Sequence, residues 1–174
     1  MNGRLARLAR IDRRLTRWMA EHAVTFLRVS IGVVFIWFGV LKFFPGVSAA
    51  DELATGTISV LTFGLLQPDV SRILLALLET AIGVGLLTGR FLRLTLLLLF
   101  GQMVGTVTPL FLFPEETWEL APVVPTLEGQ YILKNMVLIA AGLTIGATVR
   151  GGGVLDDPES YAAARAAGLP PRDR

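Results

Sequence analysis

The sequence predicts an all-α membrane protein, a transmembrane four-helix bundle with short interfacial helices between the first and second spans. Hydrophobic residues make up 53% of the 174 residues, and charged residues make up 17%, compared with about 25% in an ordinary soluble domain. Four apolar stretches are each long enough to cross about 30 Å of hydrocarbon as a helix. Most of the charged residues fall between these stretches, as expected for loops in water.

The chain begins with a basic leader, residues 1–22, followed by the first predicted span, residues 23–44. Arginines fill the leader, and apolar residues recur every three or four positions, at Leu5, Leu8, Ile11, Leu15 and Trp18. This pattern predicts an amphipathic helix lying among lipid headgroups. Binding to nucleic acid fits less well beside a transmembrane span. A cleaved signal peptide is a competing interpretation, but the apolar run exceeds the usual 7 to 15 residues or so.

The connection after the first span contains a capping-box pattern that starts at Ser48 and an apolar stretch at residues 58–66. The stretch is too short to span. We therefore predict two short helices lying at or dipping into the interface and ended by Pro68. Asp69 or Ser71 would then cap the second span.

The remaining spans are predicted at residues 72–88, 91–113 and 130–149. Pro109 should kink the third span or end it early, because proline lacks the backbone N–H that a helix interior uses. Gly89 is a natural end for the second span. Residues 151–174 start with three glycines and form a flexible tail. The membrane domain therefore covers residues 23–150.

Charge bias predicts the orientation. Arginines gather in the leader, in the turn with Arg90 and Arg93, and in residues 150–174, whereas acidic residues gather in the other two connections. By the positive-inside rule, the arginine-rich segments are cytoplasmic. We expect a multi-pass protein of the plasma (inner) membrane with both termini in the cytoplasm.

Glu79 lies near the middle of the second span. A carboxylate in hydrocarbon is unfavourable unless it is neutralised, paired or placed beside water, so it is a functional candidate by default. Lys42 and Lys134 fall at a similar depth, and we predict that one of them pairs with Glu79. The alternative is that the lysines reach outward to the headgroups, which for Lys42 is about as well supported, and that Arg28 does so toward the cytoplasm.

Polar and small residues share helix faces with these charges. Gln102 and Thr106 lie on one face of the third span, and Asn135 follows Lys134 on the fourth. The candidate ligand-binding or gating site is therefore Glu79, Lys134, Lys42, Asn135, Gln102 and Thr106. Helix packing is the better explanation for the glycines and threonines on these faces. Arg90 and Arg93 are candidates for a cytoplasmic docking surface.

The residue types limit the chemistry. The chain has no cysteine, so it holds no thiol centre, disulfide or cysteine-ligated iron–sulfur cluster of its own. Its one histidine, His22, lies outside the spans, which excludes a bis-histidine haem within one copy. We predict no catalytic residue and no metal site. The oligomeric state stays open.

Three short motifs carry a resemblance to a known family. They are Gly39-Val-Leu-Lys42-Phe, Leu78-Glu79-Thr-Ala-Ile-Gly83 and Gly129-Gln-Tyr-Ile-Leu-Lys134-Asn135. In this order, on a four-span plan, they resemble the DoxX-like integral membrane proteins and look closest to the YkgB-type members. The likeness covers about residues 23–150. It implies a four-helix membrane bundle associated with redox complexes, and it suggests a quinone as ligand.

The function expected from residues and resemblance together is that of an inner-membrane accessory protein of redox homeostasis and oxidative-stress defence. It would bind a quinone-like lipid or dock a soluble or membrane oxidoreductase, and is not expected to be catalytic on its own. One alternative is a small-solute or anion transporter in which Glu79 is protonated and gates access. Another is a structural membrane subunit without a ligand, in contact with membrane lipid only.

Overall fold

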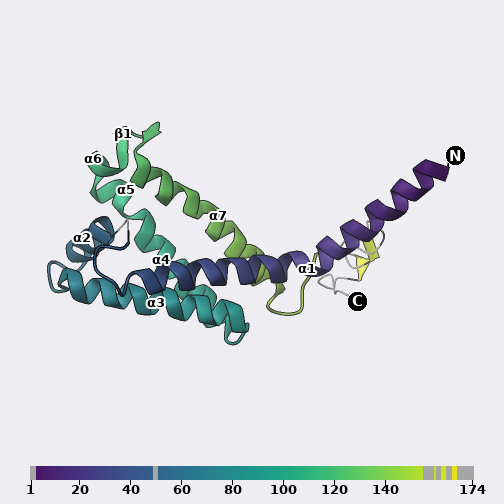
Figure 1. Cartoon of the computed structure of the whole chain (residues 1–174), viewed down its shortest axis with the longest axis horizontal. Coiled ribbons are helices and arrows are strands. Elements are labelled where there is room, and N and C mark those ends of the chain that lie inside the picture. The colour runs from purple at the N-terminus through teal and green to yellow at the C-terminus, as the bar shows by residue number, and fades with distance from the viewer. Residues whose placement is uncertain (1–2, 49–50, 155–158, 160–161, 164–165, 168–174) are drawn as a thin grey trace.

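The computed structural model describes residues 3–48, 51–154, 159, 162–163 and 166–167. Four of its helices are long and apolar enough to cross a membrane, and they confirm the predicted fold class (Figure 1). These are α1 (Gly3–Leu41), α3 (Pro68–Thr88), α4 (Leu92–Val107, continued by α5, Pro109–Leu112) and α7 (Leu127–Thr148). Between them lie α2 (Asp51–Leu61), α6 (Pro114–Thr117) and an antiparallel strand pair, β1 (Trp118–Leu120) and β2 (Val124–Pro125).

Helix α1 joins the leader and the first span into one helix of 39 residues, whereas the sequence predicts a boundary near residue 22. No glycine or proline lies between Gly3 and Gly32, so nothing in this stretch interrupts the backbone hydrogen bonds. At about 1.5 Å per residue the helix is about 58 Å long, nearly twice the thickness of the hydrocarbon core. Figure 1 shows its N-terminal part projecting away from the other spans.

In the described part of the connection from α1 to α3 there is one short helix, α2, where the sequence predicts two. The predicted apolar stretch is cut after Leu61, where Phe63 and Gly64 take positive φ values of 54° and 77°. Residues 49–50 of the predicted capping box lie outside the described residues. Helix α3 begins at Pro68, four residues earlier than expected, because proline fits the first turn, where its missing N–H is not needed.

Two other boundary predictions are confirmed. Pro109 ends α4 at Val107, and α3 stops at Gly89, whose φ of 67° is left-handed and whose N–H bonds to the carbonyl of Gly85. Helix α7 starts three residues before the predicted boundary, because the hydroxyl of Thr126 accepts a hydrogen bond from the N–H of Gly129. Most of the predicted tail, including residues 168–174, lies outside the described residues.

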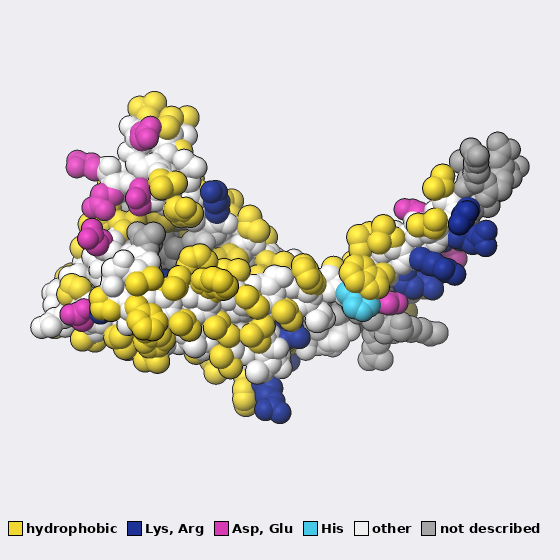
Figure 2. All heavy atoms as spheres, in the orientation of Figure 1, with side chains coloured by type: hydrophobic (Ala, Val, Ile, Leu, Met, Phe, Trp, Pro, Cys, Tyr) yellow, Lys and Arg dark blue, Asp and Glu magenta, His cyan; other side chains and the backbone are white. Residues whose placement is uncertain are grey.

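The core lies between α1, α3 and α4, with one end of α7 packed against it. Its buried apolar residues are Ile31, Phe35, Ile82, Leu86, Leu96, Leu99, Met103, Ala141 and Ile145. Toward the strand pair, α7 diverges from α1 and α3 (Figure 1). Large apolar side chains cover much of the visible outer surface of the spans, as a lipid environment requires (Figure 2).

Candidate functional site

A buried ion pair joins Lys42, directly after the end of α1, to Glu79 of α3 at the centre of the polar cluster. Lys42 Nζ lies 2.8 Å from Glu79 Oε2, and the two residues are only 7% and 8% exposed. Gln102 of α4 donates from Nε2 to the other carboxylate oxygen, Glu79 Oε1, at 2.7 Å. Both oxygens of the carboxylate therefore have partners, as a buried charge requires. Of the two predicted partners of Glu79, the structure selects Lys42, which turns inward and not toward the headgroups.

Gly39 explains why Lys42 can reach Glu79. A Cβ added to Gly39 would lie 2.8 Å from Thr80 Oγ1 and 2.9 Å from the backbone nitrogen of Thr80. Only a residue without a side chain lets α1 approach α3 this closely. Lys42 follows less than one turn later, directly after the end of α1. The close helix contact and the ion pair are thus produced by the same short segment.

Arg72 extends the cluster outward, a role that is not among the predictions from the sequence. Its side chain is buried and donates to the backbone carbonyl of Lys42 at 3.3 Å and to Asp69 Oδ1 at 2.8 Å. Its Nε lies 3.7 Å from Asp51 Oδ2, at the start of α2. The seven-residue spacing to Glu79 puts both residues on one face of α3 and could have indicated this role. Polar contacts therefore lead from exposed Asp69 to the buried carboxylate.

The remaining predicted site residues lie apart from Glu79 or are satisfied locally. The Thr106 hydroxyl donates to the backbone carbonyl of Gln102 at 2.9 Å. Lys134 is exposed, and its Nζ lies 5.3 Å from the centre of the Tyr131 ring. Asn135 is half-buried on α7. The structure thus brings together Lys42, Glu79 and Gln102. Lys134 and Asn135 lie apart from them, on the part of α7 that diverges from α3.

Arg28 has an inward role as well. Its guanidinium donates to the backbone carbonyls of Leu86 and of Leu87, the latter at 3.2 Å. These carbonyls belong to the last turn of α3. Carbonyl groups at this position have no hydrogen-bond donor within the helix and carry partial negative charge. Of the two alternatives for Arg28, the structure therefore shows the one in which the side chain turns toward α3 and not toward the cytoplasmic headgroups. Arg90 and Arg93, the predicted docking residues, are exposed in and just after the turn between α3 and α4.

Several buried polar atoms in this region have no hydrogen-bond partner among the described residues. They are Asp51 Oδ1, Ser71 Oγ, Thr80 Oγ1 and Gln102 Oε1. Buried polar atoms in proteins are usually paired with protein or ordered water, so these mark places where a small polar group would be stabilised. In the same described ranges, no cluster of His, Asp and Glu side chains has the grouping of a metal site.

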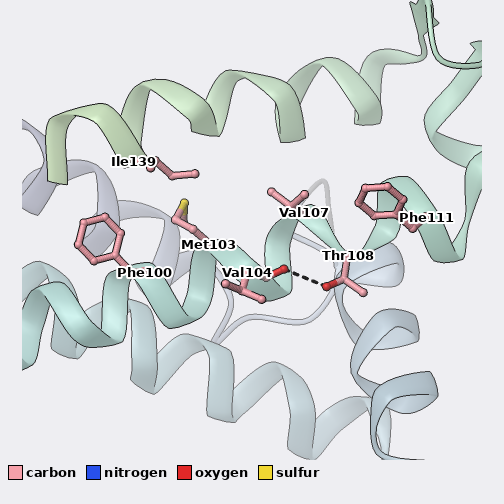
Figure 3. Close-up of a pocket in the computed structure, with 7 residues that line it drawn as sticks. All are labelled: Phe100, Met103, Val104, Val107, Thr108, Phe111 and Ile139. Atoms are coloured by element: carbon pink, nitrogen blue, oxygen red, sulfur yellow. Dashed lines mark hydrogen bonds between the residues drawn. The ribbon is translucent and has the colours of Figure 1, made fainter. Parts of the chain in front are cut away.

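An apolar groove lies between α4, α5 and α7, with a volume of about 480 Å³. Its lining residues are Phe100, Met103, Val104, Val107, Thr108, Phe111 and Ile139. Figure 3 shows Ile139 of α7 across the groove from Met103, and the Thr108 hydroxyl bonded to the Val104 carbonyl. At 100° per residue, Gln102 lies on nearly the opposite face of α4 from the lining residues. One helix therefore separates the groove from the ion pair.

Four apolar helices of spanning length around a buried ion pair define a multi-pass α-helical membrane protein. The family model DoxX matches residues 23–113, more than half of the chain, and the chain belongs to the DoxX family. The matched region contains Lys42, Glu79 and Gln102, whereas the third predicted motif, on α7, lies outside it. No curated protein and no solved structure gives a significant match.

Proposed function

We propose that this DoxX family member is an inner-membrane accessory protein of redox homeostasis and oxidative-stress defence that binds a quinone-like lipid and docks a partner oxidoreductase. The observation that carries the proposal is the groove between α4, α5 and α7. It is open to the surface of the spans, where Val104 and Phe111 are 73% and 78% exposed. A ligand dissolved in the bilayer could therefore enter the groove laterally from the lipid, without passing through the aqueous phase.

The chemistry of the groove suits a flat ring with a hydrocarbon tail. Phe100 and Phe111 offer aromatic faces, Met103 adapts to irregular ring shapes, and the Thr108 hydroxyl is the one polar side-chain group in the lining. Behind α4, the contacts of Glu79 with Lys42 and Gln102 hold the wall of the groove against α1 and α3. In this proposal Glu79, Lys42 and Gln102 are gating residues, because they set the position of α4 and so control the access of the ligand to the groove.

A blocking substitution tests the groove. Val104→Trp should reduce the quinone that co-purifies with the protein by about tenfold or more, the effect of losing contacts worth about 1.4 kcal/mol. The measurement is quinone extracted per mole of protein purified from membranes in mild detergent. Leu94→Trp is the matched control, because Leu94 is also exposed on α4 but does not line this groove.

Two results would contradict the proposal. The first is equal quinone content in wild type and both variants, and the second is no quinone in any of them. In that case the interpretation as a structural membrane subunit without a ligand would gain support.

The distribution of charge supports a cytoplasmic docking surface. In Figure 2 acidic side chains gather over α2, α6 and the strand pair, whereas basic side chains lie mainly at the turn between α3 and α4 and along the N-terminal part of α1, where some acidic side chains also lie. By the positive-inside rule, the basic end faces the cytoplasm, with both termini on that side. Arg90, Arg93 and the leader would then be available to an acidic partner oxidoreductase.

The absence of cysteine allows a direct test of this orientation. In intact cells or spheroplasts, Glu119→Cys should react with a membrane-impermeant maleimide, because the strand pair is expected on the outer side. Arg90→Cys should react only after the membrane is opened. If Arg90→Cys were labelled in sealed cells and Glu119→Cys were not, the orientation would be the opposite of the proposed one.

Transport is a second candidate function, and the line of polar contacts from Asp69 through Arg72 to Glu79 favours it. Such a line offers a small anion or a proton favourable positions from the surface inward. Solute flux in proteoliposomes that is lost in Glu79→Gln, together with a quinone-free groove, would favour this function over the first.

A further inference from the structure

A second groove lies between α4 and α7, at the end of the molecule where α4 begins and α7 ends. It has a volume of about 380 Å³. Two arginines line it, Arg93 from the first turn of α4 and Arg150 just after α7. The rest of its lining is apolar or small, namely Leu96, Leu97, Phe100, Gly146, Ala147 and Val149. The groove therefore combines two positive charges with a hydrocarbon-like surface.

Its charge is uncompensated within the lining. No aspartate or glutamate lines the groove, and both arginine side chains are exposed. Guanidinium groups bind phosphate oxygens through paired hydrogen bonds, and basic pockets between spans are suited to anionic lipid headgroups. An anionic phosphate group is the chemical partner that these two arginines fit.

The apolar part of the groove continues along the seam between α4 and α7. Phe100 lines both this groove and the larger one beyond it. An added Cβ at Gly146 would lie at ordinary contact distance, 3.5 Å, from Leu96 Cδ1, so the missing side chain leaves this space free in the groove. An acyl chain that starts near the arginines can follow this seam toward Phe100. A free phosphate ion would gain nothing from such a surface.

We propose that this groove is a binding site for an anionic phospholipid, with the phosphate held by Arg93 and Arg150 and an acyl chain lying along the seam between α4 and α7. The proposal does not rest on the proposed quinone function, although Phe100 lines both grooves. Arg93, which the proposed function places on the docking surface, would here hold lipid, and Arg90, which is not in the lining, would remain available for docking.

Native mass spectrometry of the full chain tests the site. The protein, stripped of lipid in mild detergent, is titrated with phosphatidylglycerol or with phosphatidylcholine of the same acyl chains. Arg93→Gln and Arg150→Gln should each weaken phosphatidylglycerol binding about fivefold, and the double variant about 25-fold, as expected for one basic residue each at a charged lipid surface. Arg90→Gln is the matched control and should bind as the wild type does, while phosphatidylcholine should bind more weakly to all.

A second variant separates lipid from free phosphate. Ala147→Trp fills the apolar groove without changing charge and should also weaken phosphatidylglycerol binding, with a melting temperature close to that of the wild type. The proposal is overturned if the double arginine variant binds phosphatidylglycerol as the wild type does, or if Arg90→Gln loses as much as Arg93→Gln. It is also overturned if phosphatidylcholine binds the wild type equally well, or if Ala147→Trp has no effect.

Discussion

Lys42→Met should destabilise the protein by about 3 to 5 kcal/mol, because it leaves the carboxylate of Glu79 buried without its counter-ion. The double variant Lys42→Met with Glu79→Gln should regain most of this loss, since it removes both charges and can keep the contact with Gln102. The measurement is the free energy of unfolding in mixed micelles of mild detergent and sodium dodecyl sulfate.

Lys134→Met serves as the matched control for this prediction. Lys134 is exposed and contacts the ring of Tyr131, so its replacement should change the free energy of unfolding by no more than about 0.5 to 1 kcal/mol. If Lys134→Met were as destabilising as Lys42→Met, the loss could not be assigned to the ion pair of Lys42 with Glu79, and the prediction would fail.

Gly83→Ala should separate α1 from α3 and destabilise the protein by about 1 to 3 kcal/mol, the usual range for overpacking. An added Cβ would lie 2.6 Å from Ile36 Cγ1 and 2.8 Å from both the carbonyl oxygen of Gly32 and the backbone nitrogen of Ile36. Two of these three atoms are backbone, so the clash cannot be relieved by a side-chain rotation. The same unfolding measurement reports the effect.

Gly105→Ala provides the comparison, because an added Cβ there meets nothing within 4 Å. It should be neutral or stabilise α4 by up to about 1 kcal/mol, the difference in helix propensity between the two residues. Equal effects at Gly83 and Gly105 would show that the close contact of α1 and α3 contributes little to stability.

The fold class was predictable because a span is defined by length and hydropathy, which are local properties of the sequence. The end of a helix depends on more specific features. The change from a basic to an apolar composition near residue 22 suggested a boundary, yet a helix continues until a residue interrupts its hydrogen bonds, and none does so before the last turns of α1. Conversely, Pro109 and Gly89 end helices through their own backbone chemistry, and both positions were predicted correctly.

The candidate site was predictable only in part, because sequence gives depth in the membrane better than lateral position. Depth placed both Lys42 and Lys134 near Glu79, but only the close approach at Gly39 decides which lysine reaches it. Gln102 was found through the polar face of its span. Arg72 is absent from the predicted site, since its burial depends on where α2 and the end of α1 fold back against α3.

Helix α1 connects the buried ion pair to the basic leader as one continuous helix. Lys42 follows one end of this helix and is fixed to Glu79. Figure 1 shows that α1 bends between the part that lies along α3 and its N-terminal part, so the leader leaves the bundle at an angle. The ion pair therefore anchors one end of the helix, whereas the bend sets the direction of the basic leader.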